Sequence, residues 1–273
     1  MTWLQAILLG ALEGLTEFLP VSSTGHLVLF GASLGHEDEA AKTLSIVIQL
    51  GAVLAVIVHY WSLLAELGRG VLARDPAKLR LALALGIAFL PAALVGLAFH
   101  RTIKEHLFGS RPVAYALIAG GVVMVAVELA RRGKPTHDGS TLDDVTPSRA
   151  LVIGLAQCFS LWPGMSRSMT TIVGGQLSGL GTATAAEFSF LLSIPVLGAA
   201  TVYDLYKGGG ALLASEGGGL SLGLGLLSAF VVSMLAIGGF LRYLKRFGLL
   251  PFGLYRVVLG VVVLLLVGAR APG

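Results

Sequence analysis

The chain has 273 residues, of which 55% are hydrophobic and 12% are charged, and its mean hydropathy is +0.86. Soluble domains carry about 25% charged residues, so this composition excludes a soluble globular protein and indicates an integral membrane protein. The formal net charge of +4 forms no basic stripe interleaved with aromatic residues, which excludes nucleic-acid binding. The apolar runs do not alternate with polar residues, so an all-α protein is expected rather than a membrane barrel.

The first half of the chain is expected to hold one re-entrant pair and three spans. Leu4–Leu19 and Gly25–Leu34 flank a break at Pro20, and both are shorter than the roughly 20 residues that a span needs. Two half-helices that enter the membrane and return on the same side explain both lengths, because non-helical backbone at that depth is tolerated where it lines a cavity. Three spans follow at Leu44–Trp61, Leu81–Phe99 and Pro112–Leu129.

The same order of segments restarts after a polar connection, Arg131–Arg149. A short apolar segment ends at Pro163, and spans follow at Ala186–Tyr206, Leu220–Leu241 and Phe252–Val267, with a flexible glycine-rich loop between the first two. Pro20 aligns with Pro163 and Ser23 with Ser166, at an offset of 143 residues. We therefore predict one polytopic domain, residues 1–273, built from two repeats at about 1–135 and 146–273. An odd number of spans per half makes the repeat inverted in topology.

The charges of the loops orient this arrangement in the membrane. Of the 19 Lys and Arg residues, eleven lie in three loops that the topology places on one side, and six lie on the other. The positive-inside rule puts the richer side in the cytoplasm. The three loops are Glu66–Arg80, Arg131–Arg149 and Arg242–Gly248. Both chain ends and the mouth of the first re-entrant pair then face outside, and the tips of the two pairs can meet within the bilayer.

The first polar break, E-G-L-T-E-F-L-P-V-S-S-T-G-H, carries two acids and a histidine. Glu13 and Glu17 share one helix face, and a charge near the bilayer centre costs at least about 2.5–3.5 kcal/mol. Three arrangements relieve this cost: one acid stays protonated, a cation bridges the two, or an arginine pairs with them. The alternative without a functional role is that both acids face water at a helix end. His26 can act as a base, an acid or a nucleophile, or it can be a buried histidine whose ring nitrogens are hydrogen-bonded for structure alone. Three hydroxyls between them can cap the following helix or contact substrate: Ser22, Ser23 and Thr24.

The second polar break, P-G-M-S-R-S-M-T-T, carries a cation at the start of a helix. Arg167 stays charged and presents a fork that suits phosphate oxygens, and the helix start adds free N–H groups. The alternative is that Arg167 only pairs with a glutamate for structure. The accompanying hydroxyls are candidate substrate ligands: Ser166, Ser168 and Thr171. Arg256, inside the last span, suits either a helix-end role or contact with substrate.

Together these residues predict hydrolysis of a phosphoryl group on a lipid-linked substrate. A transferred phosphoryl needs arginine or a metal to stabilise its charge, and its attacker needs a base. A lipid-phosphate transporter or flippase is the rival interpretation, because inverted repeats with broken helices are typical of transporters. A structural bundle with polar interhelical contacts is a third. The histidine–glutamate constellation favours the enzyme, and clustering of the charges in two loops argues against the bundle.

Both breaks resemble the signature motifs of the bacterial undecaprenyl-diphosphate phosphatases of the bacitracin-resistance type, as do the runs K-T-L-S-I-V-I-Q-L-G-A-V-L-A-V and P-F-G-L-Y-R. The resemblance implies hydrolysis of undecaprenyl diphosphate in the bacterial plasma membrane, and the topology predicted from the loop charges opens the site to the periplasmic face. The resemblance also implies a divalent cation, magnesium or calcium, with Glu13 and Glu17 either as its ligands or as a proton-handling pair. The expected partners are the polyprenyl diphosphate and membrane lipid, and a homodimer is left open. Ser23, His26 or water is the expected attacking group, and Arg167 the stabilising one.

Overall fold

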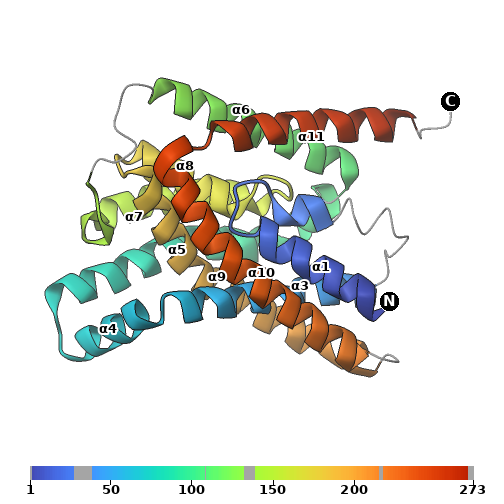
Figure 1. Cartoon of the computed structure of the whole chain (residues 1–273), viewed down its shortest axis with the longest axis horizontal. Helices are drawn as coiled ribbons and strands as arrows, with labels where there is room; N and C mark the ends of the chain where they lie inside the picture. The colour runs from blue at the N-terminus through green and yellow to red at the C-terminus, as the bar shows by residue number, and fades with distance from the viewer. Residues whose placement is uncertain (1, 28–38, 108, 132–138, 215–217, 270–273) are drawn as a thin grey trace.

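The computed structural model describes residues 2–27, 39–107, 109–131, 139–214 and 218–269, and within these ranges it contains helices and no strand (Figure 1). Among the described residues, five helices are long and apolar enough to cross a membrane, and a sixth span results if one bent pair of helices is counted as one. The helices are α1 (Trp3–Thr16), α3 (Glu39–His59), α4 (Trp61–Leu72), α5 (Pro76–His106), α6 (Ser110–Ala130), α7 (Pro147–Cys158), α8 (Arg167–Leu177), α9 (Thr182–Ala214), α10 (Gly218–Phe247) and α11 (Leu250–Ala269), with single 3₁₀ turns η1 (Leu142–Asp144) and η2 (Phe159–Leu161). The prediction of an all-helical membrane protein is confirmed.

Helix boundaries differ from the sequence expectation where capping residues extend a span beyond its apolar run. α5 begins at Pro76, because Asp75 accepts a hydrogen bond of 2.8 Å from the backbone N–H of Ala77 and proline suits the first helical position. The glycine-rich stretch predicted as a flexible loop is helical up to Ala214. This part of α9 lies beyond the candidate span Thr182–Val202, so the helix continues past its apolar run.

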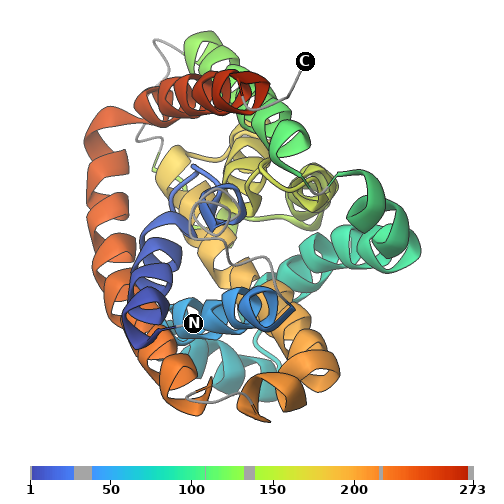
Figure 2. The same ribbon diagram turned by 90° about the vertical axis from the view of Figure 1, so that its right-hand side faces the viewer.

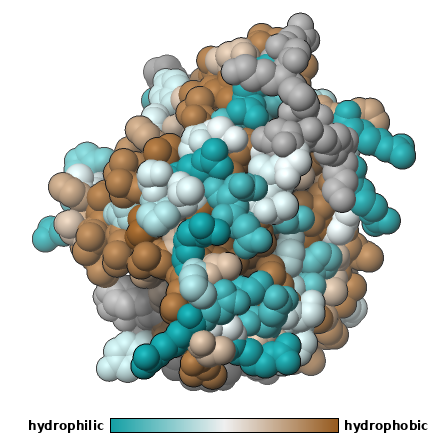
Figure 3. All heavy atoms as spheres, turned by 90° about the vertical axis from the view of Figure 1, so that its left-hand side faces the viewer, coloured by the Kyte–Doolittle hydropathy of each residue, from teal (hydrophilic) through white to brown (hydrophobic). Residues whose placement is uncertain are grey.

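A sharp bend follows the first expected span, Leu44–Trp61. Its apolar run ends at His59, and α4 then turns away by 73°. A salt bridge of 2.7 Å between Lys78 and Glu66 joins α4 to the start of α5, so most of the predicted Glu66–Arg80 loop is a helical hairpin. Exposed basic residues of this hairpin and of the end of α10 lie at the left-hand end of the bundle (Figure 1), where hydrophilic side chains gather across the middle of the face (Figure 3).

Two broken segments reach the centre of the molecule from opposite ends of the bundle. α1 enters from the right-hand end in Figure 1, and α7 enters from the left-hand end (Figures 1 and 2). The second broken segment returns to the side it came from, because a Cβ on Gly179, after α8, would lie 3.7 Å from the guanidinium of Arg149, at the start of α7. The re-entrant path is therefore observed for the second loop. The return limb of the first is described only over residues 23–27, which are helical.

Each first limb packs against a span from the other half of the chain: α1 lies along α10, and α7 lies along α5. The α1–α10 contact is close, because a Cβ on Gly14 would lie 2.6 Å from the carbonyl oxygen of Ala229. Hydroxyl groups of α10 also bind the α1 backbone, with Ser228 Oγ donating to the Ile7 carbonyl at 2.9 Å. Small residues and interhelical hydrogen bonds are what hold membrane helices together, so the depth of α1 is set by α10. The predicted inverted symmetry itself stays a prediction.

Candidate active site

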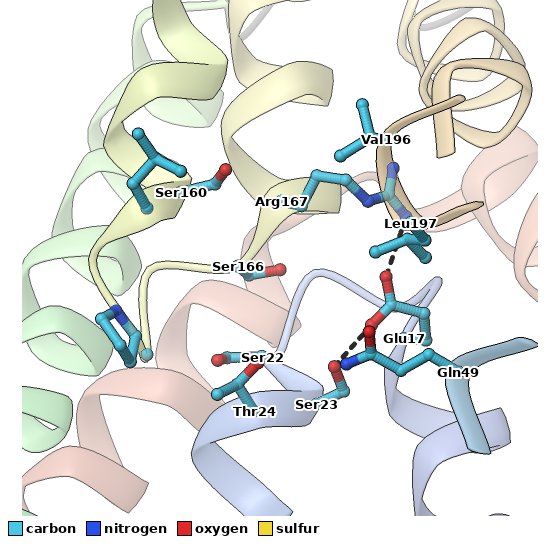
Figure 4. A pocket seen from close by; sticks show the side chains of 13 residues that line it. Glu17, Ser22, Ser23, Thr24, Gln49, Ser160, Ser166, Arg167, Val196 and Leu197 are labelled. Carbon is cyan, nitrogen blue, oxygen red and sulfur yellow. Dashed lines mark hydrogen bonds and ion pairs between the residues drawn. The ribbon is translucent and has the colours of Figure 1, made fainter. Parts of the chain in front are cut away.

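A cavity of about 220 Å³ lies where the two re-entrant loops meet, at the ends of α1 and α7 and the start of α8 (Figure 4). Both loops contribute polar groups to its wall, and α3, η2 and α9 contribute the rest. The lining residues are Glu17, Ser22, Ser23, Thr24, Gln49, Ser160, Leu161, Pro163, Gly164, Ser166, Arg167, Val196 and Leu197. The prediction that the two motifs come together is confirmed, since residues about 150 positions apart in sequence share one cavity.

An ion pair joins the two loops across this cavity. Arg167 Nη2 lies 3.1 Å from Glu17 Oε1, and their side chains are only 8% and 6% exposed. Charges so poorly hydrated interact strongly when paired and are costly when separated. Of the three ways to relieve two buried acids, pairing with an arginine is therefore the one that the structure shows for Glu17.

Glu17 also accepts a hydrogen bond from a serine of its own loop. Ser23 Oγ donates to Glu17 Oε2 at 2.5 Å, and both side chains line the cavity (Figure 4). A hydroxyl within hydrogen-bond reach of a carboxylate base is the arrangement that activates a serine nucleophile. One carboxylate thus contacts both the hydroxyl and the guanidinium.

Arg167 is held from behind by α9. Its Nη1 donates to the carbonyl oxygen of Ser189 at 2.8 Å, and Ser189 Oγ lies 2.6 Å from Thr171 Oγ1. Ser189 is fully buried. It was not predicted from the sequence, because a single serine in an apolar span usually forms a hydrogen bond between helices and has no catalytic role. The Nε of Arg167 has no hydrogen-bond partner among the described residues, which leaves one buried donor for a ligand.

Both loops turn into their second helices through a strained serine. Ser22 has φ of 72° and Ser166 has φ of 70°, a left-handed conformation that is uncommon for residues other than glycine and often found at functional sites. Each serine then caps its helix: Ser22 Oγ accepts from the N–H of Gly25 at 3.2 Å, and Ser166 Oγ accepts from that of Met169 at 3.3 Å.

This geometry corrects the predicted alignment of the two loops. Ser22, and not Ser23, is the conformational counterpart of Ser166, because the cap and the positive φ fall on these two residues. Alignment by identity matched Ser23 with Ser166 because two adjacent serines differ only in the backbone conformation that the fold imposes. Ser23 is therefore released from capping and points its hydroxyl at Glu17.

The predicted substrate hydroxyls divide into two sets. Ser22, Thr24 and Ser166 line the cavity. Ser168 lies behind the wall, where its Oγ donates to the carbonyl oxygen of Leu19 at 3.0 Å and so ties the second loop to the first. Thr171 also lies behind the wall, bonded to the Arg167 carbonyl at 2.8 Å. The hydrogen bonds of Ser168 and Thr171 therefore stabilise the loops.

Glu13 lies one turn before Glu17 and is fully buried. Both of its carboxylate oxygens lack a hydrogen-bond partner in the described part of the chain, and Glu13 is not among the cavity-lining residues. Within that same part, no group of three or more histidine, cysteine and acidic residues gathers to hold a metal. The two adjacent carboxylates nonetheless fit a hard divalent cation, which takes oxygen ligands and completes its shell with water or phosphate oxygens. The unpartnered oxygens of Glu13 are the observation that supports such a site.

His26 is placed beside the cavity and not in its wall. Its Nδ1 lies 2.8 Å from the Ser22 carbonyl oxygen, and its Nε2 lies 2.7 Å from the hydroxyl of Tyr255. Tyr255 comes from α11, and its ring lies parallel to the imidazole with centroids 5.8 Å apart. Sequence reasoning did not single out Tyr255, because a tyrosine near a span end usually reads as an interfacial anchor.

Arg256 is fully buried and is not itself a cavity-lining residue, and the hydrogen bonds of its guanidinium go to backbone carbonyls. From the first loop it binds the Pro20 carbonyl at 3.1 Å, and from the second it binds those of Gly164 at 2.9 Å and Met165 at 3.0 Å. A Cβ on Gly120 would collide with this guanidinium, so the glycine makes room for it. These contacts tie both loops to α11, and contact of Arg256 with substrate stays a prediction.

Several lining residues were not predicted as site residues. Gln49 and Ser160 add polar groups, and Leu161, Val196 and Leu197 make one part of the wall apolar. Gln49 was within reach of sequence reasoning, because an amide inside an apolar span is costly unless it has a partner or a function. The apolar residues were not, since any leucine or valine of a span fits that description.

Comparison with a family model and with curated proteins gives matches that cover nearly the whole chain. The family model described as bacitracin resistance protein BacA matches residues 6–262. A curated relative from Sorangium cellulosum (strain So ce56), named undecaprenyl-diphosphatase, is 66% identical over 264 residues, which is 97% of this chain and 86% of the relative. The match therefore includes both re-entrant loops and the cavity between them.

Proposed function

Because the chain belongs to the bacitracin resistance protein BacA family, we propose that it hydrolyses undecaprenyl diphosphate to undecaprenyl phosphate and inorganic phosphate. This reaction recycles the lipid carrier of cell-wall synthesis and confers resistance to bacitracin. The relative is named undecaprenyl-diphosphatase, which supports the assignment of this substrate. The observation that carries the proposal is Glu17, whose carboxylate contacts both the Ser23 hydroxyl and the Arg167 guanidinium in a cavity inside a membrane bundle.

The diphosphate is expected to bind at the start of α8. Free backbone N–H groups and the positive end of the helix dipole favour an anion there, and Arg167 supplies a fixed charge. The Nε–H of Arg167 has no partner in the described ranges, and the Nη2 donor that it shares with Glu17 can pass to a phosphoryl oxygen. That exchange would release Glu17 to act as a base when substrate is present.

We assign the attack to Ser23. Its Oγ forms a bond to the terminal phosphorus while its proton passes to Glu17, the bond to the bridging oxygen breaks, and Glu17 gives the proton to the departing undecaprenyl phosphate. Water then attacks the phosphoserine. Glu17 takes one of its protons and returns it to the Ser23 oxygen as the phosphorus–oxygen bond breaks, which yields inorganic phosphate. Arg167 stabilises the transferred phosphoryl in both steps.

A divalent cation can bind at this site and assist the catalytic residues. Glu13 and Glu17 would hold it, and when bound it would neutralise charge on the diphosphate. Ser23, Glu17 and Arg167 perform the proton and phosphoryl chemistry described above. Magnesium and calcium both take oxygen ligands, so the carboxylates do not choose between them.

We further propose that the cavity opens to the periplasmic face. The basic α4–α5 hairpin and the end of α10 lie at the opposite end of the bundle from the start of α1 and the end of α11 (Figure 1). The positive-inside rule places the basic end in the cytoplasm. The first re-entrant loop, which carries Glu17 and Ser23, would then be entered from outside, where the released carrier diphosphate is found.

Phosphate release by the purified protein in detergent tests the proposal. Wild type should release phosphate from undecaprenyl diphosphate, and Ser23→Ala and Glu17→Gln should lose at least about a thousandfold in rate, which is the size of effect expected when a nucleophile or its base is removed. Ser178→Ala is the matched control, because that hydroxyl donates to the Gly175 carbonyl at the far end of α8. Full activity of Ser23→Ala would overturn the assigned nucleophile. Lipid movement in sealed vesicles without phosphate release would instead identify a transporter.

A further inference from the structure

Both nitrogen atoms of the His26 ring are engaged by other protein groups. The Ser22 carbonyl oxygen at 2.8 Å can only accept a hydrogen bond, so Nδ1 carries the hydrogen. In the neutral ring Nε2 is then an acceptor, and the Tyr255 hydroxyl at 2.7 Å donates to it. His26 thus has a fixed tautomer and a fixed ring plane, and the group that fixes them is Tyr255.

The far end of this chain of contacts is the peptide bond that precedes Ser23. The Ser22 carbonyl oxygen accepts twice from His26, from Nδ1 at 2.8 Å and from its backbone N–H at 3.2 Å. This oxygen belongs to the peptide group that joins Ser22 to Ser23, so its direction sets where the Ser23 side chain starts. Ser22 is held in a left-handed conformation, φ 72°, which persists only when its surroundings hold it in place.

We propose that Tyr255 is a positioning residue for the reaction. Its hydroxyl orients His26, which holds the Ser22 carbonyl, and Ser23 is thereby kept 2.5 Å from Glu17. The inference rests on the proposed function, in which Ser23 attacks phosphorus. It gives His26 a structural task at the site instead of a chemical one, in keeping with its position outside the cavity wall.

The next residue of α11 supports the same task. Arg256 donates to the Pro20 carbonyl at 3.1 Å, so two consecutive residues of α11 hold the first loop on either side of its strained turn. Tyr255 itself is 45% exposed, so removal of its hydroxyl opens no cavity in the core. A change in rate without a change in stability is therefore a usable signature for Tyr255→Phe.

Four variants test the inference by steady-state phosphate release. Tyr255→Phe should lower kcat about tenfold and leave KM within about twofold, because one orienting hydrogen bond is lost while the cavity keeps its lining. Asparagine at position 26 can place an N–H donor near the position of Nδ1, so His26→Asn should retain activity similar to that of Tyr255→Phe. His26→Gln, whose amide reaches the position of Nε2 instead of Nδ1, and His26→Ala, which has no side-chain donor, should fall about a hundredfold or more.

A double variant separates positioning from an independent contribution. Since Tyr255 acts through the ring of His26, adding Tyr255→Phe to His26→Asn should change kcat by less than about twofold. Tyr115→Phe is the matched control, because Tyr115 is 54% exposed on α6 and takes no part in the site. Thermal unfolding of the single variants should match that of wild type.

Two results would overturn the inference while the proposed function stands. One is an active wild type with a kcat for Tyr255→Phe equal to that of Tyr115→Phe. The other is a His26→Asn variant as inactive as His26→Ala, which would show that the imidazole itself takes part in the chemistry. A wild-type protein that releases no phosphate would overturn the proposed function, and the positioning role with it.

Discussion

The buried guanidinium of Arg256 offers the sharpest test of how the site is held together. Arg256→Met keeps an unbranched side chain of similar reach and removes every donor. Three loop carbonyls lose a hydrogen bond as a result: those of Pro20, Gly164 and Met165. Because two of these belong to the second loop and one to the first, the substitution removes the contact that ties both loops to α11.

The expected cost follows from the number of orphaned groups. A buried polar group left without a partner costs about 1–3 kcal/mol, so three carbonyls give about 3–9 kcal/mol. Water entering from the adjacent cavity would restore part of this, and removing the desolvated charge is itself favourable, so we take the lower end, about 3 kcal/mol. At about 2–4 °C per kcal/mol, the midpoint of thermal unfolding should fall by about 6–12 °C.

The assay measures thermal unfolding and phosphate release on the same detergent-solubilised samples without and with substrate. Arg242→Met is the control, because Arg242 is exposed and its Nε bonds to the Gly238 carbonyl of its own helix. Arg256→Met should be both less stable without substrate and at least about tenfold slower. If it unfolds at the wild-type temperature while KM rises, Arg256 contacts substrate, and the positioning role derived from its carbonyl contacts is refuted.

Three further variants probe the loop, the arginine and the acid pair. Gly164→Ala should lose activity or fail to fold, because φ is 99° and a Cβ would meet the Val113 carbonyl at 2.5 Å, whereas Gly198→Ala, with nothing within 4 Å, should behave as wild type in the same phosphate assay. Ser189→Ala should slow phosphate release about three- to tenfold, since Arg167 keeps the Ser189 carbonyl but loses the hydroxyl at 3.3 Å. Glu13→Gln should weaken calcium or magnesium binding, measured by calorimetry, at least about tenfold; unchanged affinity would exclude Glu13 as a ligand.

The sequence alone was sufficient for the class of protein and for the pairing of the two motifs. Hydropathy is a local property, because each helix in lipid must satisfy its own backbone, so apolar runs such as Pro112–Leu129 predicted real spans. An ion pair between an acid of the first loop and the arginine of the second was also predictable, because buried charges need partners of opposite sign. Helix boundaries that are set by capping residues, such as Asp75, were predicted at the wrong positions, because hydropathy does not detect caps.

Tertiary structure decided which of several equivalent side chains does what. Ser22 and Ser23 are neighbours of one chemical type, and only the left-handed turn at Ser22 makes one a cap and frees the other to meet Glu17. Tyr255 lies 229 positions from His26, and its contact with that ring depends on how α11 packs over the first loop. Such contacts depend on packing between distant segments, which composition and periodicity do not specify. Residue types therefore determined the chemistry that the protein can perform, and the fold determined which atoms perform it.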